Sequence, residues 1–328
     1  MQLLRQALEA LPVGVVVEDG SRRTIASNRL ARSPLGEVAG DALAGAALNR
    51  AMVQARMGRA GSEALDLHGP RARRLEVTAS PLEDGGVVAV LVDATERRRL
   101  DAVRRDFVAN VNHELRTPIG ALGVLADALS GEQDPATLER LAGRISTEVE
   151  RARALIEDLL DFSRVEADHQ RTPERVAIAD VVEIATARVS ARAEQKGVHL
   201  DLPEAEGLPT LDGDREQLIM AVANLVDNAV KYSEAGTTVR VTASREDGAV
   251  VISVSDQGIG IPARDLDRIF ERFYRVDAAR DRRTGGTGLG LAIVRHVAAN
   301  HGGTVSVRSQ EGVGSTFTLQ LPVSAGSA

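Results

Sequence analysis

A histidine followed directly by an acid, His113 and Glu114, lies in the run from Phe107 to Pro118 at the start of a long amphipathic segment. An imidazole that titrates near neutral pH can act as a nucleophile while a neighbouring carboxylate holds or takes its proton. Pro118 is expected to kink a helix here and so to help set the exposure of the histidine. A lone histidine is more often only a solvated helix residue, so the chemical interpretation depends on the rest of the chain.

A second group of polar residues shares one face of a predicted helix from Asp214 to Tyr232. Asn224, Asn228 and Lys231 follow one another at i, i+4 and i+7, which places them on the same side of a helix. Asparagine is unfavourable inside a helix unless its amide is used. Two amides and an ammonium can hold a hard cation together with phosphate oxygens, although a polar solvent-facing surface would give the same pattern.

Two glycine-rich runs follow this helix. Asp256 comes directly after an apolar strand and can accept a hydrogen bond from an exocyclic amine, while Gly258 and Gly260 allow close approach of the backbone. The run from Gly286 to Leu291 precedes a predicted helix whose N-terminus can receive phosphate. Its spacing is neither that of a Rossmann fingerprint nor that of a Walker loop. Between the runs, the residues from Ile269 to Arg275 and the polar stretch from Val276 to Gly285 are expected to form a mobile lid.

Together these runs resemble the motifs of sensor histidine kinases. The segment around His113 resembles the phosphoacceptor box of that family. Four later segments resemble, in order, the N box, first glycine box, F box and second glycine box of its ATP domain: Asn224–Tyr232, Asp256–Gly260, Phe270–Phe273 and Gly286–Gly290. The resemblance covers about residues 95–323 with no motif missing. It implies an ATP-dependent protein-histidine kinase of a two-component system, itself a phosphoprotein, with ATP and Mg²⁺ at its site.

The resemblance also implies a role for each matching residue. His113 would attack the γ-phosphate of ATP, with Glu114 managing its ring proton, and Thr117 matches the position that phosphatase-competent members use to orient water. Asn228 would coordinate Mg²⁺ with assistance from Asn224. The other implied nucleotide contacts are Lys231 and Arg275 with phosphates, Tyr232 and Asp256 with adenine, and the glycines Gly258, Gly260, Gly286, Gly288 and Gly290.

The resemblance further implies that phosphohistidine passes its phosphoryl group to an aspartate in the receiver domain of a response regulator. The protein could also act as a phosphatase toward that regulator. Two other functions stay open. One is a non-kinase ATPase with the same nucleotide fold, whose turnover would survive loss of His113. The other is a signalling scaffold that binds nucleotide without phosphorylating anything.

The elements that must position these residues form three predicted domains, giving a multidomain α+β fold. Residues 1–94 contain short strands, a helix over about 39–57 and a hairpin around Asp84 to Gly86. The segment from Ala10 to Gly20, the pair Ser27 and Asn28, and the segment from Val92 to Arg97 resemble a PAS sensor domain. The order of the three domains is similar to that of phosphate-sensing family members. Residues 169–328 alternate helices and strands and predict an α/β sandwich. We expect its helices to begin at capping boxes formed by Asp180 with Glu183 and Asp214 with Gln217.

Residues 95–168 predict two long helices joined by a loop at residues 131–135. Each helix carries a narrow apolar stripe with three- and four-residue steps. One such hairpin buries little surface, so we expect two copies to pair into a four-helix bundle, making the protein a homodimer.

Composition limits the remaining possibilities. The 328 residues are 43% hydrophobic and only 2% aromatic, so the cores must be built from aliphatic side chains. The absence of cysteine excludes disulfides, thiolate metal sites and thiol catalysis. A net charge of −7 argues against a nucleic-acid partner. The longest apolar stretches are far too short to cross a bilayer, so we expect a cytoplasmic protein or the cytoplasmic portion of a membrane-tethered kinase.

Overall fold

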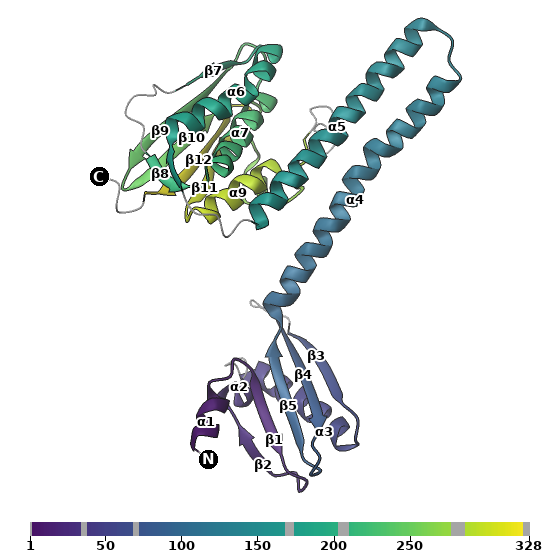
Figure 1. The fold of residues 1–328 in the computed structure, drawn as a ribbon, viewed down its shortest axis with the longest axis vertical. Coiled ribbons are helices and arrows are strands. Elements are labelled where there is room, and N and C mark those ends of the chain that lie inside the picture. Colours follow the sequence, from purple (N-terminus) through teal and green to yellow (C-terminus); the bar gives the residue numbers. More distant parts are fainter. Residues whose placement is uncertain are drawn as a thin grey trace. The chain divides into compact units, whose positions relative to one another are not determined.

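The computed structural model describes residues 2–33, 38–67, 72–167, 174–202, 210–276 and 286–323. The chain forms two compact units, Met1–Ala109 and Asn110–Ala328, and each is described by itself (Figure 1).

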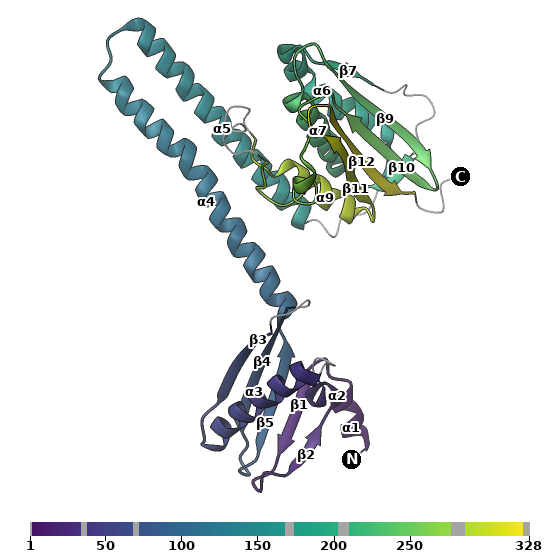
Figure 2. The same cartoon turned by 180° about the vertical axis from the view of Figure 1, so that it is seen from behind.

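The first unit is a five-stranded antiparallel sheet in the order β2-β1-β5-β4-β3, with helix α3 packed on one face (Figure 2). The predicted hairpin is confirmed, because β4 pairs with β5 from Leu75↔Asp93 to Pro81↔Val87. The core between sheet and helix consists of small aliphatic side chains such as Ala47, Ala51 and Val77. The elements before α4 are α1 Gln2–Glu9, β1 Gly14–Glu18, β2 Thr24–Ser27, α2 Arg29–Arg32, α3 Val38–Arg56, β3 Gly61–Leu67, β4 Arg73–Pro81 and β5 Val87–Asp93.

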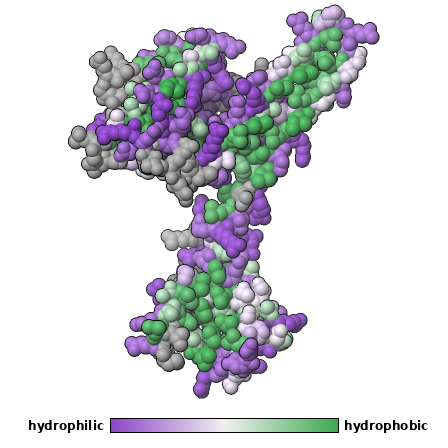
Figure 3. Space-filling view, viewed as in Figure 1, coloured by the Kyte–Doolittle hydropathy of each residue, from purple (hydrophilic) through white to green (hydrophobic). Residues whose placement is uncertain are grey.

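Two long helices follow, α4 Thr95–Ser130 and α5 Pro135–Ala167. Asp134 caps α5 by accepting a hydrogen bond of 3.0 Å from the Thr137 backbone amide. Pro118 lies inside α4. Large hydrophobic side chains remain exposed on both helices, including Ile119, Val124, Ile156 and Leu160, and Figure 3 shows apolar surface running along the hairpin. An unpartnered stripe of this kind fits the homodimeric bundle.

The part of the second unit that follows α5 contains a five-stranded sheet in the order β11-β12-β10-β9-β7. Its strands are antiparallel except for the parallel pair β7 and β9. Helices α7 and α9 pack on the sheet, and α6 packs on α7, which confirms the α/β sandwich. A separate two-stranded ribbon joins β6 and β8. The elements are β6 Glu174–Ala177, α6 Ile178–Lys196, β7 His199–Asp201, β8 Thr210–Gly213, α7 Arg215–Tyr232, β9 Thr238–Glu246, β10 Ala249–Ser255, the short 3₁₀ helix Ala263–Asp265, α9 Gly290–Asn300, β11 Thr304–Gln310 and β12 Gly314–Pro322.

The two expected capping boxes have different outcomes. The box at Asp180 is wrong: α6 already begins at Ile178, and its N-cap residue Ala177 makes no side-chain cap. Strand β6 runs directly into this helix, so the β6–β8 pairing fixes its start. Asp214 does cap α7, because its side chain accepts a hydrogen bond of 3.0 Å from the Gln217 backbone amide. Its own amide donates to Nε2 of His301 at 3.0 Å, rather than to the Gln217 side chain.

Among the described residues, none of the helices has the length and apolar content that a membrane crossing requires.

Candidate active site

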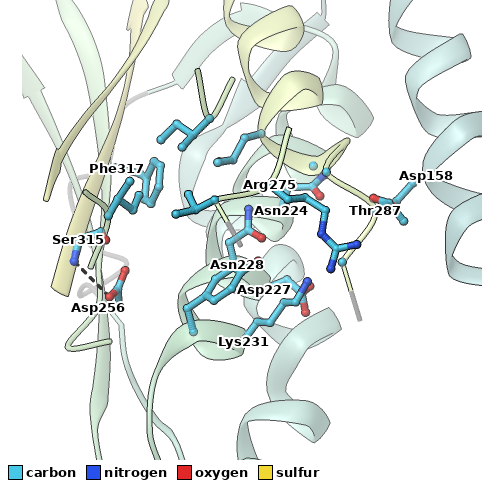
Figure 4. Close-up of a pocket in the computed structure, with 18 of the residues that line it drawn as sticks. Asp158, Asn224, Asp227, Asn228, Lys231, Asp256, Arg275, Thr287, Ser315 and Phe317 are labelled. Atoms are coloured by element: carbon cyan, nitrogen blue, oxygen red, sulfur yellow. Dashed lines mark hydrogen bonds between the residues drawn. The ribbon is translucent and has the colours of Figure 1, made fainter. Parts of the chain in front are cut away.

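A cavity of about 790 Å³ lies in the second unit, between helix α7, the two glycine runs and the C-terminal half of α5 (Figure 4). Ten of the eleven residues predicted to bind nucleotide line it: Asn224, Asn228, Lys231, Tyr232, Asp256, Gly260, Arg275, Gly286, Gly288 and Gly290. Gly258 lies beside the cavity without forming part of its wall. The sequence motifs therefore converge on one site although they are far apart in the chain.

The two asparagines of α7 meet the N-terminus of α9. The Nδ2 of Asn224 donates to the Met220 carbonyl at 2.9 Å, so its Oδ1 points away from that carbonyl and toward Gly290. A Cβ added at Gly290 would lie 2.7 Å from Asn224 Oδ1 and 3.8 Å from Asn228 Nδ2. Glycine at 290 therefore leaves room for two amides beside a helix end whose dipole favours anions.

Helix α7 is held rigidly behind these polar groups. Leu218, Val222 and Leu225 are completely buried on its opposite face. Its C-terminal end is closed by Lys196 of α6, whose Nζ donates to the carbonyls of Val230, at 2.9 Å, and of Lys231. Burial lowers the pKa of Lys196. These contacts fix the last turn of α7, from which the Lys231 side chain enters the cavity.

Asp256 directly follows strand β10, at the far end of the cavity. Its Oδ1 accepts hydrogen bonds from the amides of Gly258, at 2.9 Å, and Ser315, at 3.1 Å. Burial raises the pKa of Asp256, while these two amides act in the opposite direction. Among the described residues no hydrogen bond reaches Oδ2, which can therefore accept one from a ligand. Gly258 is required because a Cβ there would lie 2.4 Å from the Tyr232 carbonyl oxygen.

Two further glycines sit where the backbone is left-handed and crowded. Gly260 has φ of +68°, and an added Cβ would lie 2.0 Å from the Gln310 carbonyl oxygen. Gly288 has φ of +73°, and its Cβ would lie 2.8 Å from Phe273 backbone atoms. The Phe273 amide donates to the Gly288 carbonyl at 2.9 Å, which fastens the second glycine run to the F-box segment. Of the expected lid over 269–285, residues 269–276 lie within the described part of the chain, where Ile269 and Phe270 are buried.

The predicted phosphoacceptor group lies on α4 and not in the cavity wall. The His113 side chain is 79% exposed, and its Nδ1 is 3.8 Å from Glu114 Oε1, which is too long for a hydrogen bond. The Thr117 hydroxyl donates to the His113 carbonyl at 3.3 Å. The histidine is thus accessible to a partner surface, and the structure does not bring it together with the nucleotide residues.

Several cavity residues escaped the sequence analysis, among them Thr287, Phe317 and the α5 acids Glu157, Asp158 and Asp161. Thr287 lies inside the second glycine run and could have been singled out there. The α5 acids had no local signal, because Asp158 precedes its contact Thr287 by 129 positions.

The C-terminal half of α5 packs against the part of the second unit that follows it. Phe162 is 1% exposed. It meets His296 of α9 edge to face, with ring centres 5.3 Å apart. The guanidinium carbon of Arg272 lies over the Phe162 ring, 4.5 Å from the ring centre. Burial lowers the pKa of His296, and the nearby charge of Arg272 lowers it further.

Two protein families match the chain. Residues 103–168 match the family described as "His Kinase A (phospho-acceptor) domain". Residues 213–325 match the family described as "Histidine kinase-, DNA gyrase B-, and HSP90-like ATPase".

Named relatives agree with both families. The chain is 38% identical over 337 residues to the sensor-like histidine kinase SenX3 of Mycobacterium bovis, covering 98% of this chain and 80% of that protein. It is 45% identical over 238 residues to SenX3 of Mycolicibacterium smegmatis, which covers 72% of this chain and 62% of the relative.

Solved structures show the same architecture. The histidine kinase AdeS of Acinetobacter baumannii superposes with a TM-score of 0.50 at 28% identity, covering 64% of this chain and 98% of the solved chain. The histidine kinase ThkA, solved in complex with the response regulator protein TrrA, shares the fold with a TM-score of 0.56 at 19% identity, covering 97% of this chain and 98% of the solved chain. With two matching kinase families in order and a relative matched over most of its length, the chain belongs to the sensor histidine kinases, the ATP-dependent protein-histidine kinases of two-component systems.

Proposed function

We propose that the cavity presents the γ-phosphate of ATP to His113, and that the phosphohistidine then donates its phosphoryl group to an aspartate of a response-regulator receiver domain. The observation that carries this is the convergence of the Asn224 and Asn228 amides on the N-terminus of α9, in a chain that also exposes His113 on a helical hairpin. The proposal divides the chain into a sensor domain (1–94), a dimerisation and phosphotransfer hairpin (95–168) and a catalytic domain (169–328).

Adenine would bind at the Asp256 end of the cavity. Two backbone amides hold Oδ1 of Asp256, so its remaining oxygen can accept a hydrogen bond from the exocyclic amine. Tyr232 also lines this cavity and would lie near the base. A carboxylate that only accepts hydrogen bonds selects a base carrying a donor at this position.

The phosphates would bind near the second glycine run. Lys231 and Arg275 line the cavity and would contact phosphate oxygens as cations. The residues fit Mg²⁺, because Mg²⁺ prefers oxygen ligands shared with substrate phosphates, and the Met220 bond turns the Asn224 oxygen toward the site. Asn228, assisted by Asn224, would hold the ion, which supplies charge neutralisation on the phosphates when bound.

His113 would act as the nucleophile through Nε2. Its Nδ1 is the ring nitrogen nearer Glu114, so a small side-chain rotation would let Glu114 hold the Nδ1 proton, leaving the Nε2 lone pair exposed. A bond forms between Nε2 and the γ-phosphorus, and the bond from that phosphorus to the bridging oxygen breaks with its electrons leaving on ADP. Thr117 would orient water in a phosphatase reaction after releasing its bond to the His113 carbonyl.

The first unit would serve as a PAS-like sensor. Its antiparallel sheet in the order β2-β1-β5-β4-β3 with one helix across a face supports that proposal, as does its direct continuation into α4 at Thr95.

The proposal is tested by incubating the dimer with γ-labelled ATP and Mg²⁺. We expect acid-labile, base-stable label in the wild type and none in His113→Gln, while the matched variant His199→Gln, at another exposed histidine, keeps the label. Undiminished ATP hydrolysis by His113→Gln at the wild-type rate would instead support a plain ATPase. Nucleotide binding without label on the wild type or on any receiver domain would support a scaffold.

A further inference from the structure

The acidic side of α5 reaches the cavity at the end occupied by the second glycine run. Glu157, Asp158 and Asp161 all contribute to the cavity wall. In Figure 4, Asp158 faces Thr287, on the side of the pocket opposite Asp256. Negative side chains thus lie where the proposed function puts the triphosphate, which itself is strongly negative.

A direct hydrogen bond ties α5 to the glycine run. The Thr287 hydroxyl donates to Oδ2 of Asp158, and its oxygen also accepts from the Leu289 amide at 3.2 Å. Both neighbours of Thr287 in the sequence, Gly286 and Gly288, lack a side chain, so Thr287 supplies the side-chain contact of this stretch with α5. The position of this phosphate-binding segment is therefore coupled to the position of α5.

The charge on Asp158 is poorly accommodated in this contact. Burial raises the pKa of Asp158, and the nearby carboxylates Asp161 and Asp227 raise it further. The bond from Thr287 and the charge of Lys231 act in the opposite direction. Added negative charge in the cavity would increase the repulsion, because interactions between charges are strong in a partly desolvated site.

The contact extends along two more turns of α5. Arg272 forms an ion pair of 3.1 Å with Glu166, and Asn300 of α9 donates to the Val165 carbonyl at 3.0 Å. With the buried Phe162, these contacts make a discrete docked arrangement that can form or break as a unit.

We propose that Asp158 is a positioning residue that distinguishes nucleoside triphosphate from diphosphate. Its bond to Thr287 holds α5 docked when the cavity is empty or contains ADP, and the additional charge of the γ-phosphate displaces the carboxylate and releases α5. Loss of the γ-phosphate in the transfer step lets the contact form again. This inference rests on the proposed function, because it requires the phosphates to lie near Thr287.

Equilibrium binding tests the role of the charge. Asp158→Asn keeps an oxygen that can accept from Thr287 but removes the negative charge. We expect its affinity for a non-hydrolysable ATP analogue with Mg²⁺ to rise about threefold to tenfold, with affinity for ADP changed less than about twofold, by titration calorimetry. The matched control Glu139→Gln removes a charge from the exposed first turns of the same helix and should change neither value. Equal effects on both nucleotides, or the same effect in the control, would overturn the proposal.

A distance measurement tests release itself. The chain contains no cysteine, so Ser163→Cys on α5 and Gln320→Cys on β12 provide the two spin-label sites of a subunit. Forming dimers with an excess of cysteine-free wild-type chain confines both labels to one subunit. The ATP analogue should lengthen the label distance in the wild-type background and leave it unchanged with Asp158→Asn, and ADP should leave it unchanged in both. A wild-type distance that ignores the analogue would reject the inference. Neither measurement depends on phosphorylation of His113. Failure of the proposed function would be seen separately, as the absence of radiolabelled phosphate on the protein in the assay with γ-labelled ATP.

Discussion

Replacing Asp256 by asparagine separates adenine recognition from folding. In the structure, Oδ1 of Asp256 accepts from the Gly258 and Ser315 amides at 2.9 and 3.1 Å. Because both of these groups are donors, the asparagine oxygen must take the Oδ1 position. Its NH₂ group then occupies the Oδ2 position and faces the exocyclic amine of adenine, so two donors meet where a donor and an acceptor met before.

The expected magnitudes follow from these contacts. A hydrogen bond to a charged group contributes about 1.5–3 kcal/mol, so its loss should weaken ATP binding by about tenfold to a hundredfold at about 1.4 kcal/mol per decade. The unfolding free energy of Asp256→Asn should change by less than about 1 kcal/mol, because both backbone amides stay satisfied. In Asp256→Ala both amides lose their partner, and each unsatisfied group costs about 1–3 kcal/mol.

The assay is titration calorimetry with ATP and GTP analogues, alongside urea unfolding of the same proteins. Guanine carries a carbonyl oxygen where adenine carries the amine, so Asp256→Asn should also lose preference for ATP over GTP. The reasoning is refuted if Asp256→Asn binds the ATP analogue within about twofold of the wild type, or if it is destabilised as much as Asp256→Ala.

Three further outcomes follow from the structure. Gly260→Ala should lower the free energy of unfolding by about 2 kcal/mol or more, because the new Cβ would clash with the Gln310 carbonyl at a residue with left-handed backbone. Gly236 also has left-handed backbone but open space around it, so Gly236→Ala should lower the free energy of unfolding by only about 1 kcal/mol in urea unfolding. Phe162→Ala should remove about 3–5 kcal/mol from docking of α5 and broaden the spin-label distance without nucleotide; an unchanged distribution would contradict this. Burial raises the pKa of Asp256, so the folded state binds the Asp256 proton more tightly than the unfolded chain does. The unfolding free energy of the wild type, relative to that of Asp256→Asn, should therefore rise as pH falls through the raised pKa. This gain should level off below the unfolded pKa of about 4. A pH-independent difference in unfolding free energy would show that Asp256 does not titrate in this way.

Local patterns were sufficient for much of the fold. The bounds of α4 and the start of α5 match the prediction. The start of α5 was predictable because Asp134 and Pro135 combine a cap with a residue suited to the first helical turn. The stripe of Asn224, Asn228 and Lys231 was also predictable, because helical periodicity alone puts i, i+4 and i+7 on one face. Such features depend only on neighbours in sequence.

Features that depend on distant segments were not predictable in this way. Asp180 has the pattern of an N-cap, but with the β6–β8 ribbon in place the N-cap is Ala177, three residues earlier. The Ser315 amide that holds Asp256 is brought there by pairing of β10 with β12. Nothing in the residues around Asp158 indicates that its partner is Thr287. In each case tertiary packing supplies the constraint.

Helix α5 shows why one apolar stripe was too simple a description. At 3.6 residues per turn, Asp158, Phe162 and Val165 lie on one face of α5. This face contacts the part of the second unit that follows α5. Ile156 and Leu160 lie on roughly the opposite face and remain exposed in a single copy. A second copy of the chain can therefore cover Ile156 and Leu160 without displacing the part of the second unit that packs on the other face of α5. A rotation of α5 within the bundle would move both faces together, which gives a signal arriving through the hairpin a direct physical route to the Thr287 contact.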